Sequence, residues 1–213
     1  MIVAHIFPAG FPKASIEAAI ARGQGLSTSG AALESVTLEA ILPPSIALII
    51  DIETDNRKRS LADLRVVIKN HKGTVTPTSY LFNRRGRVLF EKDERGLGVD
   101  EVLDEAIEAG AEDVEADDEG NIVVWTEPSG VTAAAERLGK SLDLKVKSLD
   151  LIWHPNEDTL APLNSNETVE NLAALVDALR DEPTVQGVYT NVIQGTIEDD
   201  IWSELEEKIS VDA

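Results

Sequence analysis

The sequence contains no cysteine, which excludes a disulfide framework, a cysteine-ligated zinc site and a thiol nucleophile. Aromatic residues make up 4% of the 213 residues, and there is a single methionine. No run of apolar residues exceeds the five from Ile46 to Ile50, far fewer than the ~20 that a membrane-spanning helix needs. Basic residues are also scarce, because 19 Lys and Arg stand against 39 Asp and Glu, a formal net charge of −20.

What remains is typical of a folded domain. Apolar residues make up 43% of the chain and charged residues 27%, so the sequence can form a packed core. The first residues lack the basic region of a secretory leader, and Pro8 and Pro12 interrupt their apolar stretch. We therefore expect a soluble intracellular protein without a membrane segment.

The charge is unevenly distributed along the chain. Residues 55–95 hold eleven Lys and Arg against five Asp and Glu, a surplus of six positive charges. The rest of the chain holds eight basic and 34 acidic residues. This pattern predicts one surface that attracts phosphates on a molecule that otherwise repels them.

The first part of the chain shows helix and strand signals in alternation. A short helix is predicted over 13–22, followed by a linker rich in Gly and Ser, and a β-branched strand over Ser45–Thr54. Ser60 is a candidate cap for a helix that ends at Gly73, with Leu61, Leu64 and Ile68 on its buried side. Two further strands, Ser79–Phe82 and Arg87–Phe90, are predicted to form a hairpin around Asn83–Gly86.

The second part is acidic and repeats similar elements. Helices are predicted over Asp100–Ala109 and Ser129–Leu138, and strands over Ala111–Ala116, Asn121–Glu127 and Lys145–Trp153. A helix over Glu167–Arg180, a strand over Val185–Val192 and a final helix over Glu198–Ile209 follow.

This order predicts an α+β fold made of two ferredoxin-like sandwiches, one inserted in the other. We expect a helical remnant and linker over 1–32, a discontinuous domain with a basic face over 33–95 and 160–213, and an inserted acidic domain over 96–159.

The candidate binding surface consists of the basic side chains of the predicted helix and hairpin. If the two elements pack together, their cations form one continuous ridge that neutralises phosphates. The candidate nucleic-acid-binding residues are Arg57, Lys58, Arg59, Arg65, Lys69, Lys72, Arg84, Arg85 and Arg87.

The sequence shows no catalytic or metal-binding pattern. His5, His71 and His154 are far apart and show no metal-ligand spacing. The acidic run around Asp113–Asp118 lacks the terminal bidentate Glu of a calcium loop. We therefore expect no enzyme activity, no cofactor and no metal.

Four segments carry a resemblance to a known family: SIEAAIARGQG, ETDNRKR, AIEAGAEDV and VQGVYTN. In order and spacing they resemble the YebC/PmpR family of bacterial regulatory proteins and mitochondrial translational activators of cytochrome c oxidase. The resemblance implies three domains, of which the N-terminal helical bundle is mostly missing. The sequence departs from the family's pattern at Leu42-Pro43-Pro44-Ser45, where the family has a glycine-rich loop.

The resemblance and the basic residues together predict a non-enzymatic translation factor that associates with ribosomal RNA and the ribosome. The alternatives are a transcriptional regulator that binds duplex DNA, and a protein–protein adaptor whose basic face binds an acidic partner. We expect a monomer without membrane contact, in the mitochondrial matrix if the source is a eukaryote and in the cytoplasm otherwise.

Overall fold

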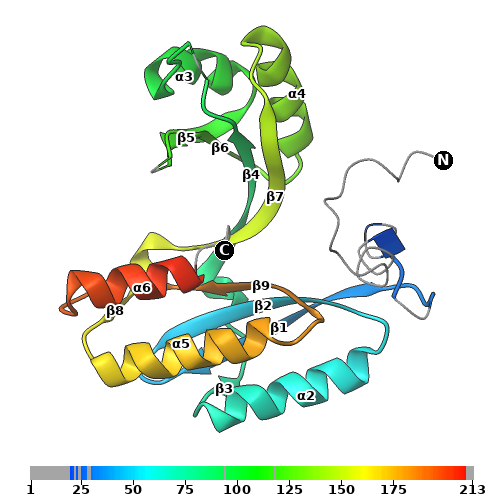
Figure 1. Ribbon diagram of the computed structural model, residues 1–213, viewed down its shortest axis with the longest axis vertical. Helices are drawn as coiled ribbons and strands as arrows, with labels where there is room; N and C mark the ends of the chain where they lie inside the picture. Colours follow the sequence, from blue (N-terminus) through cyan, green and yellow to red (C-terminus); the bar gives the residue numbers. More distant parts are fainter. Residues whose placement is uncertain are drawn as a thin grey trace, which may run out of the picture. The chain divides into compact units, whose positions relative to one another are not determined.

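The computed structural model describes residues 20, 21, 23, 25–27, 30–93, 95–117 and 119–209. The chain divides into two compact units (Figure 1). Unit 1 comprises Met1–Thr78 and Ala161–Ala213, and unit 2 comprises Ser79–Leu160. Most of the predicted helix over 13–22 lies outside the described residues. The two units are α+β in architecture, as the sequence predicts.

Unit 1 contains a four-stranded antiparallel sheet with the strand order β3-β1-β2-β9. Its strands are β1 (Glu34–Leu42), β2 (Ile46–Thr54), β3 (Thr74–Val75) and β9 (Val185–Thr190). Alternate residues of β1, from Val36 to Leu42, point into the core, where Leu38 lies opposite Ile50 of β2. The first five residues of β2 are all buried, so this strand is covered on both faces.

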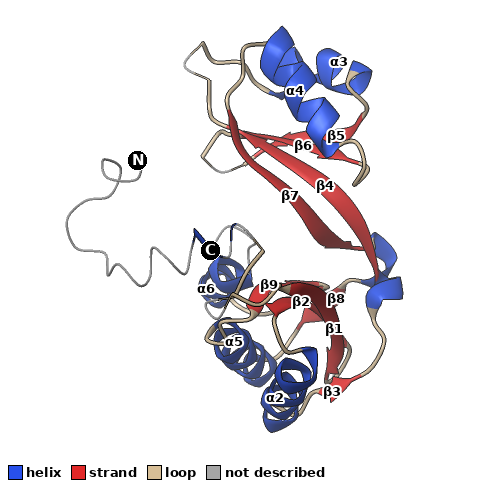
Figure 2. Cartoon of the chain, turned by 90° about the vertical axis from the view of Figure 1, so that its right-hand side faces the viewer, coloured by secondary structure: helices blue, strands red, loops and turns tan. Residues whose placement is uncertain are grey.

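Helices cover one face of this sheet (Figure 2). They are α2 (Arg57–Asn70), α5 (Asn166–Arg180) and α6 (Asp199–Ile209). Leu64 and Ile68 of α2 and Leu172 and Val176 of α5 recur at helical spacing and are buried in the same core. A small parallel pair, β8 (Ala161–Leu163) and β10 (Val192–Gln194), completes the unit.

Strand β1 was not predicted from the sequence, so the order of elements along unit 1 differs from the predicted βαββαβ order. Strand β1 precedes β2-α2-β3 in the chain and lies between β2 and β3 in the sheet. The split βαβ arrangement of a ferredoxin-like sandwich is present, but its middle strand comes first in sequence.

Unit 2 has the βαββαβ order that was predicted for the first domain. Its elements are β4 (Phe82–Phe90), α3 (Val99–Glu108), β5 (Ala111–Ala116), β6 (Ile122–Thr126), α4 (Val131–Ser141) and β7 (Val146–Pro155). They form an antiparallel sheet with the order β5-β6-β4-β7, and α3 and α4 cover one face of it (Figures 1 and 2). Two single-turn 3₁₀ helices, η2 (Ser79–Leu81) and η3 (Glu157–Thr159), begin and end the unit.

The hairpin predicted around Asn83–Gly86 does not exist. Phe82–Phe90 is one continuous strand, β4, which pairs with β6 on one side and β7 on the other. Gly86, which favoured a turn in the sequence, is needed here for close packing. A Cβ atom at this position would lie 2.6 Å from Thr126 Oγ1 and 2.9 Å from Val131 Cβ. Residues 79–95 therefore belong to unit 2 and not to the discontinuous domain to which the sequence analysis assigned them.

The turn between β5 and β6 is stabilised by Asp117. Its Oδ1 accepts hydrogen bonds from the backbone N–H groups of Glu119 (3.0 Å) and Asn121 (2.7 Å), and its Oδ2 accepts one from Asn121 Nδ2 (2.7 Å). Desolvation alone would raise the pKa of Asp117, but these hydrogen bonds and the charge of Lys147 hold it below the ordinary value of 3.8.

We expect Asp117→Ala to lower the free energy of unfolding of unit 2 by about 1–2 kcal/mol at pH 7, because three hydrogen bonds are lost. The pKa of Asp117 is lower in the folded protein than in the unfolded chain, so the ionised carboxylate stabilises the folded state. This stabilisation is complete above the pKa of the unfolded chain, and it is lost as the pH falls through the pKa of the folded protein. The difference between the two proteins should therefore shrink below pH 3.8. Urea titrations at pH 7 and at about pH 2.5 measure it; a difference that stays constant would contradict this role.

Candidate nucleic-acid interface

Helix α2 begins at Arg57, earlier than Ser60 suggested. Asn56 is its N-cap, and its side-chain oxygen accepts a hydrogen bond from Arg59 N (3.2 Å). Ser60 is buried and hydrogen-bonded to the hydroxyl of Thr54 (2.8 Å), so it joins the helix to the end of β2 instead of capping it. The first turn contains no acidic residue, and three basic residues stand there in sequence.

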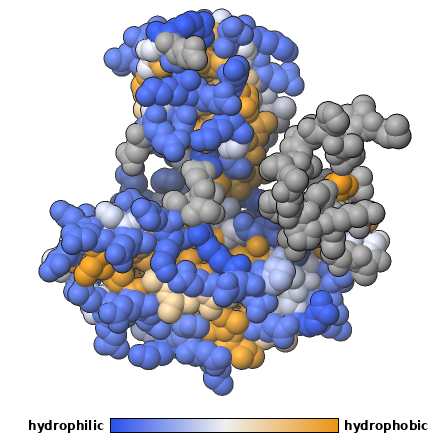
Figure 3. Space-filling model, viewed as in Figure 1, coloured by the Kyte–Doolittle hydropathy of each residue, from blue (hydrophilic) through white to orange (hydrophobic). Residues whose placement is uncertain are grey.

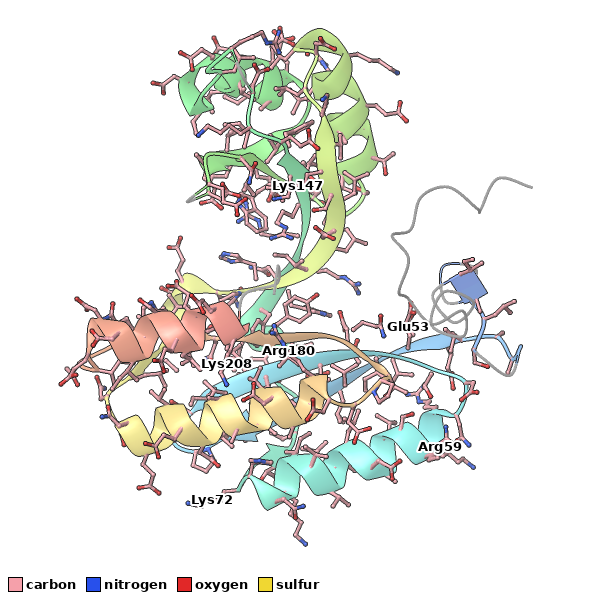
Figure 4. The ribbon with its side chains drawn as sticks, viewed as in Figure 1. Glu53, Arg59, Lys72, Lys147, Arg180 and Lys208 are labelled. Atoms are coloured by element: carbon pink, nitrogen blue, oxygen red, sulfur yellow. The ribbon has the colours of Figure 1, made fainter. Side chains whose placement is uncertain are left out.

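Six of the nine candidate residues belong to α2 or follow it directly, and all six are exposed. Lys58, Arg65 and Lys69, at intervals of seven and four, lie along one side of the helix axis, which we call the basic flank. Arg59 lies at one end of α2, and Lys72 lies just beyond the other end (Figure 4).

Most of the α2 cations are unpaired. Arg59 approaches Asp55 at 3.7 Å and Lys72 approaches Glu167 at 3.4 Å, and both of these pairs are exposed. Within the part of the chain that the structure describes, Arg57, Lys58, Arg65 and Lys69 form no ion pair. Exposed pairs contribute little stability, so Arg59 and Lys72 can exchange their partners for a phosphate.

The other helices of unit 1 carry the opposite charge. Helix α2 contains five basic residues and one acidic residue, whereas α5 contains one basic and three acidic residues and α6 one basic and five acidic residues. Helix α5 packs against both of the others. In the space-filling view, hydrophilic residues cover most of the visible face of unit 1, with apolar residues showing between them (Figure 3). A polyanion is therefore attracted to α2 and repelled by α6.

The remaining three candidates, Arg84, Arg85 and Arg87, lie on β4 in unit 2. The predicted hairpin that was to carry them does not exist, and β4 belongs to a different compact unit from α2. Arg87 is 8% exposed and its Nη2 donates to Asp150 Oδ2 at 3.0 Å. Arg85 Nε donates to Glu112 Oε2 at 3.2 Å.

Tryptophans hold two of these arginines against the sheet. The guanidinium carbon of Arg84 lies 5.3 Å from the ring centroid of Trp153, and that of Arg85 lies 5.0 Å from the ring centroid of Trp125. Both distances are within the range of a cation–π interaction. The sequence showed the arginines but gave no sign of these aromatic and acidic partners, because the partners come from β5, β6 and β7.

A cleft of 770 Å³ lies at the end of the unit 2 sheet where β4 begins. Arg84 and Arg85 line it together with four carboxylates: Glu112, Glu127, Glu157 and Asp158. These acidic groups outnumber the basic ones, so the cleft repels phosphates. The two groups of candidate residues thus differ in their surroundings: α2 contains five basic residues and one acidic residue, whereas the cleft is lined by two arginines and four carboxylates.

The described residues contain no group of three or more His, Asp or Glu side chains that could hold a metal ion. None of the described helices is both long enough and apolar enough to cross a membrane.

The structure thus consists of two α+β units, one of which carries an exposed basic helix. Residues 33–192 match the family model described as TACO1/YebC second and third domain. The chain belongs to the TACO1/YebC family.

Relatives of known sequence support this assignment. The chain is 36% identical over 186 residues to a protein of Persephonella marina named "Probable transcriptional regulatory protein". The match covers 86% of this chain and 72% of the relative. It is 38% identical over 195 residues to a protein of the same description from a Parafrankia species, covering 89% and 73%.

A solved structure has a similar fold. The crystal structure of the conserved hypothetical protein Aq1575 from Aquifex aeolicus matches with a TM-score of 0.65 and 28% sequence identity, over 80% of this chain and 70% of that one. The α+β fold class and the family resemblance predicted from the sequence are thereby confirmed.

Proposed function

We propose that this protein is a regulator of gene expression that binds duplex DNA through α2, in keeping with the transcriptional role printed in its relatives' names. The observation that carries the proposal is a set of exposed cations on α2 that form no ion pair with any residue the structure describes: Arg57, Lys58, Arg65 and Lys69. A binding protein of this kind needs no catalytic group.

The position of three cations at the start of α2 also supports phosphate binding by this helix. The N-terminus of a helix carries partial positive charge, which disfavours basic side chains there and favours an anion. Arg57, Lys58 and Arg59 nevertheless occupy the first turn of α2. A bound phosphate would relieve this repulsion, interacting with the helix end and the side chains together.

Translation is the second candidate function, with ribosomal RNA as the partner. It is favoured by the composition of the basic flank, because Lys and Arg spread along a helix recognise phosphates of either nucleic acid and carry no sequence information. The acidic α5 and α6 would then face basic proteins near the RNA.

We expect binding to depend steeply on salt. Four phosphate contacts give a slope of about −3.6 for log K against log [salt] on duplex DNA. Fluorescence anisotropy with a DNA duplex and with a folded ribosomal RNA fragment, each at several salt concentrations, measures this slope. Tight binding to the duplex together with altered transcription from a bound promoter in a purified system is the expected result.

Cosedimentation with ribosomes, together with these binding measurements, separates the candidates. Cosedimentation with ribosomes at moderate salt, without binding to the duplex, would overturn the DNA proposal and support the translation candidate. Binding to neither nucleic acid would overturn both and leave the adaptor role.

A further inference from the structure

Helix α3 of unit 2 exposes apolar side chains that its own fold does not use. Val102 and Ala106 are fully buried in the core of unit 2, as expected for the inner side of an amphipathic helix. Leu103 and Ile107, one turn apart, are 38% and 60% exposed. Ile107 is the most exposed aliphatic side chain among the large hydrophobic residues that the structure describes.

Acidic residues surround this apolar pair. Helix α3 contains five acidic residues and no basic one. Asp100, Asp104 and Glu108 follow one another at intervals of four residues, an arrangement of like charges that weakens a helix. Glu108 pairs with Arg137. Asp100 and Asp104 form no ion pair with any described residue, and helical geometry places them beside Leu103 and Ile107.

We propose that this face of α3 is a docking surface for a basic amphipathic segment of a partner protein. The apolar side chains of the segment would cover Leu103 and Ile107, and its Lys or Arg residues would neutralise Asp100 and Asp104. This proposal does not depend on α2 or on nucleic acid, since α3 belongs to the other unit.

The charge of unit 2 selects this occupant over the alternatives. Residues 79–160 contain 20 Asp and Glu against nine Lys and Arg. A second copy of the chain would bring two acidic α3 helices together, and a nucleic acid would bring phosphates to the same carboxylates, so both are repelled. A cationic segment is attracted, and it removes the like-charge repulsion within α3.

Binding of a synthetic probe tests the proposal. The probe is a Leu/Lys peptide of roughly 18 residues with Leu at helical spacing, and its partner probe has Glu in place of every Lys. Isothermal titration with the full chain at about 50 mM and about 300 mM NaCl measures both affinities. We expect the Lys peptide to bind, more weakly at high salt, and the Glu peptide not to bind.

Two pairs of variants locate the binding. Ile107→Ser should weaken it at least tenfold, whereas Val66→Ser, at a 58% exposed position of α2, should leave it unchanged. Asp104→Lys should weaken binding, whereas Glu204→Lys on the acidic α6 should not. All four positions are exposed, so circular dichroism should show wild-type folding.

Several outcomes would overturn the proposal. Equal binding of the Glu peptide, or no effect of Ile107→Ser, would show that the apolar pair is not a docking surface. An equal loss from Glu204→Lys and Asp104→Lys would show general attraction to an acidic protein. A wild-type dimer in analytical ultracentrifugation that Ile107→Ser dissociates would show that a second copy occupies this face.

Discussion

Simultaneous replacement of Lys58, Arg65 and Lys69 by glutamine should weaken nucleic-acid binding about 100-fold. Each cation contributes about 1 kcal/mol when it contacts a phosphate in a solvent-exposed site, and 3 kcal/mol corresponds to roughly two orders of magnitude in Kd. With one of four phosphate contacts left, the salt slope on duplex DNA should fall from about −3.6 to about −0.9. Anisotropy titrations of the variant and the wild type give both quantities.

The matched control changes the net charge by the same amount elsewhere. Lys140, Lys145 and Lys147 of unit 2 are exposed and pair with the chain's own carboxylates, so their replacement by glutamine should alter the Kd less than threefold. If the control variant loses as much affinity as the α2 variant, binding follows total charge and the α2 interface is wrong. The replaced α2 side chains are exposed, so the melting temperature of the α2 variant should match that of the wild type.

The second large effect is expected for Phe90→Ala, which should lower the free energy of unfolding of unit 2 by about 3–5 kcal/mol. Phe90 is fully buried at the end of β4, in a core formed with Val88, Ile122 and Val124. Removal of the ring leaves a cavity that the paired strands on both sides of β4 prevent from collapsing.

This variant also tests the boundary between the units. Native-state hydrogen exchange should show faster exchange for the amides of β4, β6 and β7 and unchanged exchange for those of β1 and β2. Ile50→Ala in the core of unit 1 should give the converse pattern. Accelerated exchange in β1 and β2 of the Phe90→Ala protein would mean that β4 supports unit 1, as the sequence analysis assumed.

The helices of this protein were predictable because each carries a long apolar stripe. Helices α5 and α6 were expected within one residue of their observed starts and ends, whereas α2 begins four residues before the start that Ser60 as a cap predicts. The buried residues Leu64 and Ile68 of α2, and Leu172 and Val176 of α5, have the helical period. Strand β1 has an equally regular pattern, with Val36, Leu38, Ala40 and Leu42 pointing inward. It was not predicted because it lies between a Gly/Ser-rich segment and two prolines, and residues of these types indicate a linker or loop.

Strand β4 shows where local signals mislead. Asn83-Arg84-Arg85-Gly86 has turn composition, but the strands on either side supply hydrogen bonds, ion pairs and aromatic contacts that favour an extended chain. These partners lie up to about 70 residues away in sequence, so no local window contains them. The error placed three arginines in the wrong unit and in a hairpin that does not exist.

The family motifs mark structural positions more than binding residues. In ETDNRKR, Thr54 and Asn56 form the hydrogen bonds that start α2, and the following cations are the exposed ones. In VQGVYTN, Asn191 is 2% exposed, and its side-chain oxygen accepts a hydrogen bond from Ala47 N at 2.8 Å. The motifs thus indicate the family and the fold, whereas the basic flank had to be derived from spacing and charge.

The interruption of unit 1 by unit 2 has a consequence during synthesis. Strands β1 and β2 leave the ribosome before α5, which covers their apolar face, and 82 residues of unit 2 are made in between. At about 5–20 residues per second this delay lasts roughly 4–16 s. Unit 2 is contiguous and can fold within that time, while Leu48 and Ile50 of the nascent chain still lack the cover of α5 and α6. Newly made chains are therefore most prone to aggregation, and most in need of a chaperone, in this interval.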